Sequence, residues 1–589
     1  MNIKRTVRTA LLTALCGALL SAGMSAFAPL TASAMTYRLG DVNGSGAIDS
    51  KDYALTKRTV LRTYSLDPFQ SARADVNRNG RVDAVDYQQI KRTVLRTHTI
   101  TGTVELSETA FSAGLEYELG CAGDAYTVTG IGTCTDVELV IPDQHEGLPV
   151  TSIGEEAFYG NDRITGVTIP DAVKTIELDA FTGCSALTSV TLPEHLEVLS
   201  AGAFARCEQL KRIRLPETVR IVSMEAFAEC SSLEEAILSD GVMIIEDLAF
   251  AECSKLHSLQ LPDSLIRIGN QAFEECGFRG DEANWDGGIL YAGHAVIGSD
   301  AGSLAGVADI REGTVLIASG AFQSCEGLTG VNLPDSLTAI CGQAFGNCIG
   351  LTSVRIPEGV EYVGPNAFWY CTSLAEVSIL GAGVFTDMMA FYNTAFYNDE
   401  ANWENGVLYA GPCLLKAKPD LTGLYQVREG TCSVAGGAFS QCGQLTGVSF
   451  PETLRYIGER AFGYCKQLEE IRIPEGVERI ERMTFQGCTA LDAAFLPSTL
   501  NYIGEAAFDS APVETVIPSG VTFIGDKAFR LGGKEPLRVS FQSPEGWWAT
   551  ECIDYLECAA FSVDMTNSDE IDKYLGCHLY GKDYAFRKR

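Results

Sequence analysis

The apolar positions of the chain are dominated by one motif that recurs at a fixed spacing. From Phe158 onward it can be written A-F-x-x-C-x-x-L-x-x-V-x-L-P-x-x-V-x-x-I-G. Copies follow one another with a period of 23 within three runs, and the final step shortens to 21. Such a period indicates stacked supersecondary units, not one globular core. The anchor phenylalanines are Phe158, Phe181, Phe204, Phe227, Phe250, Phe273, Phe322, Phe345, Phe368, Phe391, Phe439, Phe462, Phe485, Phe508 and Phe529.

One copy, residues 181–199, shows how a unit is expected to fold. Leu187, Val190 and Leu192 are spaced to point into the coil, the last two on a short strand. Pro193 is expected to end that strand, where its missing N–H does least harm. A single unit leaves its apolar edges uncovered, so stability has to come from neighbouring units and from caps at both ends.

Two longer steps interrupt the spacing and resemble each other. Residues 280–298 (GDEANWDGGILYAGHAVIG) parallel residues 398–416 (NDEANWENGVLYAGPCLLK), and the regular spacing resumes after each. We expect divergent coils within the stack at both places. The chain after residue 536 is expected to form the C-terminal cap, with Trp547, Trp548 and Tyr574 as its lid aromatics.

This repeat resembles the BspA-like leucine-rich repeats over about residues 125–535, and residues 105–150 resemble the N-terminal cap of that family. The resemblance implies a leucine-rich-repeat solenoid in which each 23-residue coil contributes a β-strand plus a loop or short helix.

A second repeat lies near the N-terminus, where residues 41–64 and 75–98 are nearly identical. Each copy begins with a twelve-residue loop, 41–52 and 75–86, that places oxygen-bearing groups at positions 1, 3, 5, 7, 9 and 12. Calcium takes six to eight oxygen ligands in such an arrangement, and Gly46 and Gly80 stand where the loop turns sharply. We therefore expect two calcium ions. Their ligands are Asp41, Asn43, Ser45, the Ala47 carbonyl, Asp49 and Asp52 in one loop, and Asp75, Asn77, Asn79, the Arg81 carbonyl, Asp83 and Asp86 in the other.

The loops depart from the EF-hand pattern in having Asp at position 12 and no helical segment before them. Each is followed by one expected helix, residues 53–63 and 87–97. This order resembles a type I-like dockerin, the small all-α module that attaches secreted proteins to cohesin domains of cellulosome scaffolds, and the resemblance covers residues 38–98. It implies that calcium folds the module.

In dockerins, loop positions 10 and 11 and the following helix face contact the cohesin. The resemblance therefore implies contact residues Ser50, Lys51, Lys57, Arg58 and Arg62 in the first copy, and Ala84, Val85, Lys91, Arg92 and Arg96 in the second. Because the loop residues differ between the copies, we do not expect the two faces to bind equivalently.

The cysteines do not suggest a disulfide framework, although the chain has twenty of them. Eleven lie three positions after an anchor phenylalanine, at the inward position of successive coils, whose spacing of about 4.8 Å suits disulfide geometry poorly. We expect buried thiols there. They are Cys184, Cys207, Cys230, Cys253, Cys276, Cys325, Cys348, Cys371, Cys442, Cys465 and Cys488. Spacing leaves open whether Cys121 pairs with Cys134, and whether Cys552, Cys558 and Cys577 pair in the C-terminal cap.

Charge changes the picture by excluding classes of partner. Residues 35–98 carry 11 Lys and Arg against 7 Asp and Glu, whereas residues 99–589 carry 30 against 69. The large acidic part would repel nucleic acid and anionic lipid. At the N-terminus, a basic segment, an apolar stretch and Ala32-Ser33-Ala34 predict a cleaved export signal, and no later stretch is long enough for a membrane span.

No catalytic pattern stands out. The six histidines form no metal-spaced cluster, and there is neither a G-x-S-x-G elbow nor a P-loop. The exposed strand positions are where a solenoid would bind a ligand. They read as mixed polar without an aromatic platform, which favours a protein ligand over a polysaccharide. They include Thr188, Ser189, Thr191, Lys211, Arg212, Arg214, Glu234, Glu235, Thr352, Ser353, Arg355, Glu469, Glu470 and Arg472.

The sequence thus predicts an extracellular, non-enzymatic protein, monomeric apart from docking, that binds a scaffold cohesin and presents the solenoid to an unknown protein or cell-surface ligand. Two alternatives remain: a polysaccharide-degrading or peptidase component with an unrecognised active site, and an adhesin for host or substrate surfaces. The expected boundaries are 1–34 signal peptide, 35–98 dockerin, 99–104 linker, 105–157 N-terminal cap and first coil, 158–535 repeats and 536–589 C-terminal cap.

Overall fold

The computed structural model describes residues 111–120, 123–531, 537–553, 556–562 and 583–588 of the repeat region and its ends, together with residue 565. Nearer the N-terminus it describes residues 36–38, 48, 53, 56, 74, 76, 87, 90, 91 and 103–105. There, β1 (Thr36–Arg38) pairs antiparallel with β2 (Thr103–Glu105). The chain divides into two compact units, one of residues 26–265 and 271–282, the other including residues 266–270 and 283–589.

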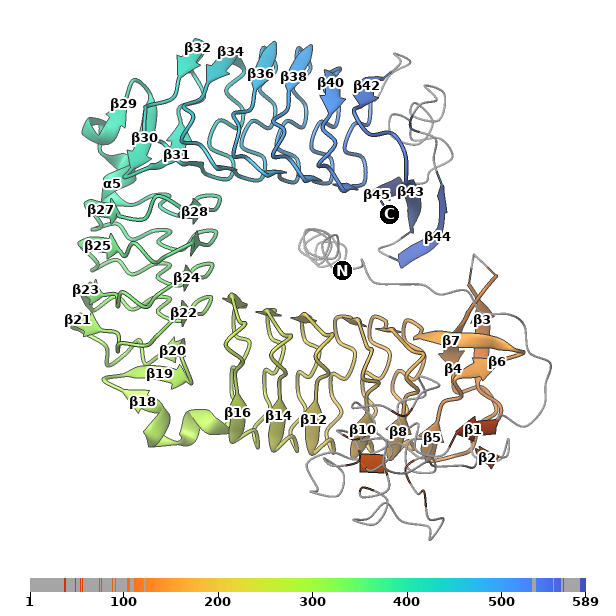
Figure 1. The fold of residues 1–589 in the computed structure, drawn as a ribbon. Helices are drawn as coiled ribbons and strands as arrows, with labels where there is room; N and C mark the ends of the chain where they lie inside the picture. The colour runs from red at the N-terminus through yellow and green to blue at the C-terminus, as the bar shows by residue number, and fades with distance from the viewer. Residues whose placement is uncertain are drawn as a thin grey trace. The chain divides into compact units, whose positions relative to one another are not determined.

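In the first unit each repeat forms one coil that contributes two short strands, and the strands of successive coils stack side by side (Figure 1). A three-residue strand follows the recurring leucine of the motif, and a two-residue strand lies on the return side of the coil. The strands are β3 (Glu116–Leu119), β4 (Tyr126–Gly130), β5 (Glu138–Val140), β6 (Gln144–His145), β7 (Leu148–Ile153), β8 (Gly166–Thr168), β9 (Thr175–Ile176), β10 (Ser189–Thr191), β11 (Val198–Leu199), β12 (Arg212–Arg214), β13 (Ile221–Val222), β14 (Glu235–Ile237), β15 (Ile244–Ile245) and β16 (Ser258–Gln260).

The register between coils equals the sequence period. Ser189 pairs with Gly166 and Leu199 with Ile176 in parallel strands, so each residue lies beside the same motif position of the preceding coil. Pro193 lies two positions beyond the end of β10, Leu187 is fully buried, and Val190 and Leu192 are half-buried. Leu187 is therefore inward as predicted, whereas Val190 and Leu192 are buried only in part, like Thr191 between them.

The anchor phenylalanines form a continuous stack through the core. From Phe158 to Phe273 successive ring centroids lie 4.9 to 5.7 Å apart and the ring planes are nearly parallel. The backbone joins the same positions, because Phe181 N–H donates to the Ala203 carbonyl at 2.8 Å. Each coil thus covers the apolar edge of its neighbour.

The predicted cysteine positions are buried free thiols in the structure. They also donate hydrogen bonds, which the sequence pattern did not indicate. Cys184 Sγ lies 3.2 Å from the Phe158 carbonyl oxygen, and Cys207 Sγ lies 3.3 Å from that of Phe181. In nine of the eleven, the thiol of one coil bonds the anchor residue of the coil before it. Cys442 instead donates to the Lys418 carbonyl, and Cys325 contacts the Ser299 hydroxyl. Cys134 is also a buried free thiol, and so is not paired with Cys121.

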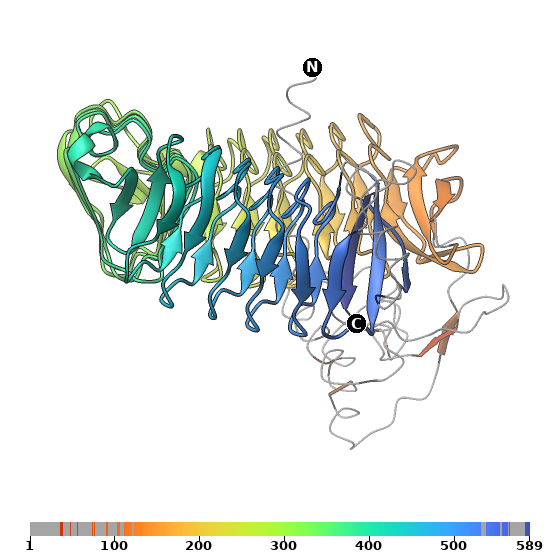
Figure 2. The same cartoon turned by 90° about the horizontal axis from the view of Figure 1, so that it is seen from above.

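The second unit has the same architecture of stacked coils (Figure 2). Its anchor phenylalanines stack at 4.9 to 5.3 Å in two runs, Phe322–Phe391 and Phe439–Phe529. Its parallel strands are β17 (Arg267–Ile268), β21 (Gly306–Asp309), β22 (Leu316–Ile317), β23 (Leu328–Asn332), β24 (Ala339–Ile340), β25 (Ser353–Ile356), β26 (Tyr362–Val363), β27 (Glu376–Ile379), β28 (Phe385–Thr386), β32 (Thr422–Gln426), β33 (Ser433–Val434), β34 (Gln444–Ser449), β35 (Tyr456–Ile457), β36 (Glu470–Arg472), β37 (Arg479–Ile480), β38 (Ala493–Phe495), β39 (Tyr502–Ile503), β40 (Glu514–Ile517), β41 (Phe523–Ile524) and β42 (Arg538–Phe541).

The two interruptions of the spacing are antiparallel three-stranded meanders. One consists of β18 (Trp285–Asp286), β19 (Ile289–Ala292) and β20 (Ala295–Ser299), the other of β29 (Trp403–Glu404), β30 (Val407–Ala410) and β31 (Cys413–Ala417). In each, the last strand rejoins the stack by parallel pairing, β20 with β22 and β31 with β33. The helical elements described are short and lie before these meanders: η2 (Gly277–Gly280), η3 (Glu282–Asn284), α5 (Ala395–Asn398) and η4 (Glu400–Asn402).

Antiparallel strands close the C-terminal end. β43 (Trp547–Ile553) lies between β44 (Leu556–Ser562) and β45 (Asp583–Lys588), and β45 pairs with β41 of the stack. Trp547 is buried against Phe541, with ring centroids 5.4 Å apart, and its indole N–H donates to the Ser543 carbonyl. Trp547, one of the three predicted lid aromatics, is thus buried at this end; the side chains of Trp548 and Tyr574 lie outside the described residues.

Candidate functional site

The twelve predicted calcium ligands lie outside the described residues, as do nine of the ten predicted cohesin contacts; Lys91 is described and is half-buried. What the structure does describe is how the two copies of the loop–helix repeat meet. Tyr53 and Tyr87 each follow a twelve-residue loop directly. Their rings stack with centroids 5.3 Å apart, and their hydroxyl oxygens are 2.8 Å apart.

This tyrosine pair joins equivalent positions of the duplicated sequence. Thr56 and Ile90 are a second pair of equivalent positions, and both are fully buried. Lys91 lies with its ammonium 5.9 Å from the Tyr87 ring centroid. A residue in contact with its own repeat equivalent indicates a pseudo-twofold arrangement. The residues that directly follow the two loops are therefore in contact with each other.

The residues of the two loops fit calcium in their chemistry. Their side chains offer carboxylate, amide and hydroxyl oxygens, which a hard cation prefers, and no thiol or imidazole. Among the described residues, no group of three or more His, Cys, Asp or Glu side chains could hold a metal ion. Within that same part of the chain, no helix has the length and apolar character required to cross a bilayer.

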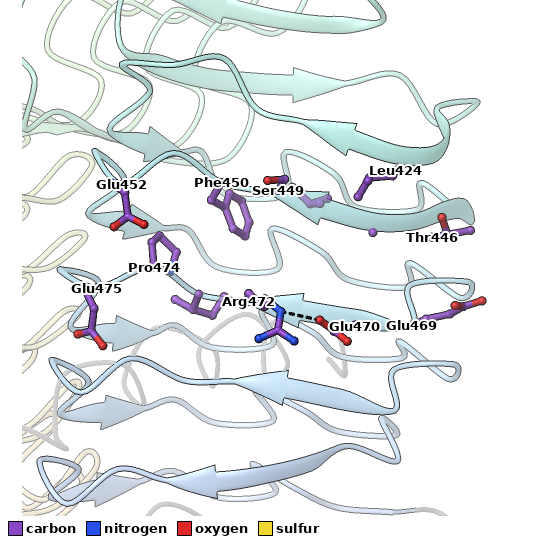
Figure 3. A pocket seen from close by; sticks show the side chains of 13 residues that line it. Leu424, Thr446, Ser449, Phe450, Glu452, Glu469, Glu470, Arg472, Pro474 and Glu475 are labelled. Atoms are coloured by element: carbon purple, nitrogen blue, oxygen red, sulfur yellow. Dashed lines mark ion pairs between the residues drawn. The ribbon is translucent and has the colours of Figure 1, made fainter.

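On the solenoid, a surface hollow of about 630 Å³ lies over β32, β34 and β36 (Figure 3). Its cause is a change of side-chain size across the sheet. Leu424 on β32 pairs with Gly447 on β34, and Gly447 pairs with Glu470 on β36, so the middle strand lacks a side chain there. A Cβ at Gly447 would lie 3.0 Å from Leu424 Cδ1, which shows that the leucine leans over the glycine.

The hollow has an apolar floor and an acidic rim. Phe450, Ile473 and Pro474 supply apolar surface beside Leu424, which is 73% exposed. Glu452 and Glu475 stand at one end and Glu469 and Glu470 at the other, as Figure 3 shows. The predicted surface residues Glu469, Glu470 and Arg472 thus come together at one site.

The charges of the rim are only partly neutralised. Arg472 Nε lies 2.7 Å from Glu470 Oε1, and its guanidinium covers the Phe495 ring at 3.7 Å. Glu475 accepts hydrogen bonds from the Ser498 backbone N–H and hydroxyl, which lower the pKa of its carboxyl. In the part of the chain described, Glu452 and Glu469 form no ion pair. The rim therefore carries net negative charge.

The sequence did not indicate the apolar part of this surface. Leu424, Phe495 and Val516 are 73%, 44% and 50% exposed, and all lie on strands of one sheet. One signal was available: Phe495 occupies a strand position at which Thr191, Arg214 and Arg472 stand in other coils.

The family models agree with this architecture. The model of the BspA type leucine rich repeat region matches residues 151–279, 307–404 and 425–532, more than half of the chain. The chain belongs to this family. Residues 280–306, between the first two BspA-type matches, contain β18 to β20. A second model, that of the dockerin type I domain, matches residues 39–95.

Solved structures similar to the chain include other leucine-rich repeat proteins. One from Bacteroides ovatus is 20% identical over 73% of this chain and 98% of that one, with a TM-score of 0.22. A leucine rich cell surface protein from Faecalibacterium prausnitzii is 22% identical over 74% and 94%, with a TM-score of 0.23. The leucine-rich repeat protein of T. pallidum is 24% identical over 42% and 91%, with a TM-score of 0.24. Among curated proteins none matches.

Dockerin and BspA-type repeats are the domains found in this chain, and neither is catalytic; no catalytic domain is identified. A dockerin implies docking to a cohesin.

Proposed function

We propose that the protein is a secreted, non-catalytic component that attaches through a calcium-loaded dockerin to a cohesin of a scaffold protein. Its BspA-type repeats then present an extended surface to a protein or cell-surface ligand. The observation that carries the proposal is the dockerin match over residues 39–95, which spans both predicted calcium loops.

Two features of the chain support a calcium-dependent module. Each loop offers its oxygens at the spacing that calcium requires, and calcium ligation supplies folding free energy that so small a domain lacks. The stacked tyrosines Tyr53 and Tyr87 link the starts of the two helical segments. Loading of the two loops is therefore expected to be coupled, and the cohesin is expected to bind the loaded form.

The repeats support the presenting role. Within each run of repeats the phenylalanines stack from coil to coil, and the strand surfaces face solvent with charged side chains such as Arg212 and Glu470. A stack of this kind offers a long binding surface whose residues are fixed by the regular backbone. An extracellular location is consistent with the dockerin and with the predicted export signal.

Capture of the full chain by a panel of immobilised cohesins, in calcium and after chelation, tests the proposal. We expect one or a few cohesins to retain the chain in calcium and to release it on chelation. A variant with Asp41→Ala and Asp75→Ala should not be retained, whereas Asp335→Ala, an exposed acid of the solenoid, should behave as the native chain does. Retention that survives chelation would contradict the proposal.

A further inference from the structure

The hollow over β32, β34 and β36 has a counterpart elsewhere in the solenoid, and the comparison shows what is special about it. The first coil after each meander carries an exposed apolar residue opposite a glycine: Val307 pairs with Gly330 as Leu424 pairs with Gly447. Val307 is 60% exposed. At the next strand, however, Thr352 and Ser353 stand where the later copy has Glu469 and Glu470. Both copies have an exposed apolar residue opposite a glycine, but only the later copy has carboxylates at these two positions of the next strand.

The charges of the later copy favour a cationic ligand. Four glutamates surround the hollow and its one arginine is already held by Glu470, so Glu452, Glu469 and Glu475 face solvent without a cation in the part described. Nucleic acids and acidic glycans would be repelled.

The aromatic rings of the site argue against a sugar. The Arg472 guanidinium lies 3.7 Å from the centroid of the Phe495 ring and so covers one ring face. Phe450 is half-buried and packs edge-on against Phe462, with centroids 6.0 Å apart. Neither ring is a free flat platform, whereas aliphatic side chains can pack on Leu424 and Pro474.

We propose that this hollow binds an extended segment of another protein in which Lys or Arg residues flank apolar ones. The basic side chains would pair with the glutamates of the rim, and an apolar side chain would pack in the hollow against Leu424 and Phe450. Apolar contact at the centre with charges at the rim is the usual arrangement of protein interfaces. The inference names the ligand class of the solenoid and so rests on the presenting role proposed above, but it does not depend on cohesin binding.

The test uses the full chain and short labelled peptides, with binding followed by fluorescence anisotropy at about 0.15 M salt, where long-range attraction is screened. The probe alternates lysine with leucine. One control peptide alternates lysine with serine, and the other alternates glutamate with leucine. We expect the lysine–leucine peptide to bind and both controls to bind at least about fivefold more weakly.

Matched variants locate the binding. Glu452→Lys should reverse a rim charge and Gly447→Val should fill the hollow, each weakening binding about fivefold or more. Asp335→Lys and Gly330→Val make the same changes at the equivalent positions of the earlier copy, and should stay within about twofold of the native chain. Thermal melting checks that all four variants are folded.

Several outcomes would overturn the inference. Equal losses in the two copies, or equal binding of the lysine–serine peptide, would mean general attraction to an acidic protein. Loss of peptide binding on calcium chelation would place it on the dockerin instead. If the chain forms a dimer and Gly447→Val dissociates it, the hollow binds a second copy of the chain and not another protein. Failure of cohesin capture with intact peptide binding would remove only the docking role.

Discussion

At the residue scale, the turns of the solenoid contain residues with left-handed backbone at repeated positions, which the sequence motif does not predict. Two residues flanking an anchor phenylalanine have left-handed backbone, for example Glu225 (φ 56°) and Glu229 (φ 59°) around Phe227. The N–H groups of all three residues donate to carbonyls of the next coil, at 2.7 to 3.1 Å. The hydrogen bonds between coils therefore stabilise a conformation that is unfavourable for a residue with a Cβ atom.

One such position carries a residue that suits it poorly. Met389 has φ 58° and its side chain is 53% exposed, whereas the equivalent residue one coil earlier is Asn366 at φ 57°. Asparagine adopts this conformation more readily than methionine. We predict that Met389→Asn raises the free energy of unfolding by about 0.5–1 kcal/mol, measured by chemical denaturation. Asn366→Met should lower the free energy of unfolding by a similar amount. If both substitutions changed the free energy of unfolding in the same direction, backbone strain at Met389 would not be the cause.

At the scale of the element, the unit of stability is the contact between coils. Phe227 is fully buried and stacks on Phe204 and Phe250, with centroid distances of 5.7 and 5.2 Å. In a repeat array each coil is stabilised mainly by its neighbours, so the loss of one ring weakens two contacts.

We therefore predict that Phe227→Ala destabilises the array by about 3–5 kcal/mol, the cost of a large cavity that cannot collapse fully. Hydrogen exchange should show the loss of protection centred on the coils of Phe204, Phe227 and Phe250. Tyr159→Ala, at a turn position that is 55% exposed, is the control and should change stability by no more than about 0.5 kcal/mol. A Phe227 variant as stable as the Tyr159 variant would refute the stacking argument.

How far the sequence predicts each element depends on whether a periodic residue encodes it. The anchor phenylalanines and cysteines carry the coil register, and the structure has that register, Ser189 opposite Gly166. The sequence shows the meanders as interruptions of the period but does not show their antiparallel pairing. Strands β29 and β30 are too short for an alternation of apolar and polar residues to be visible. The hollow depends on Leu424, Gly447 and Glu470 meeting across three strands, which no local pattern shows.

At the scale of the whole molecule, the many buried thiols link stability to pH. Burial raises the pKa of Cys184 and that of Cys442 to about 12, whereas the pKa of a thiol in the unfolded chain is about 8.5. Below that lower value both states are protonated and the stabilisation is complete. Above it the unfolded chain loses protons that the folded chain keeps, so stability falls as pH rises toward about 12.

We predict that the melting temperature falls between about pH 8 and pH 10.5. A variant with Cys184→Ala and Cys207→Ala should show a shallower fall than the native chain, since two of the responsible thiols are absent. That comparison separates the thiols from the tyrosines. An identical pH profile in the variant would show that the thiols do not cause the effect.

In the proposed function, calcium controls the attachment of the whole molecule to a scaffold. Calorimetric titration of a captured cohesin into the full chain, once in calcium and once with a chelator, tests this most directly. We expect a complex of one cohesin per chain in calcium and no binding heat with the chelator. Binding of equal affinity in both solutions would contradict it.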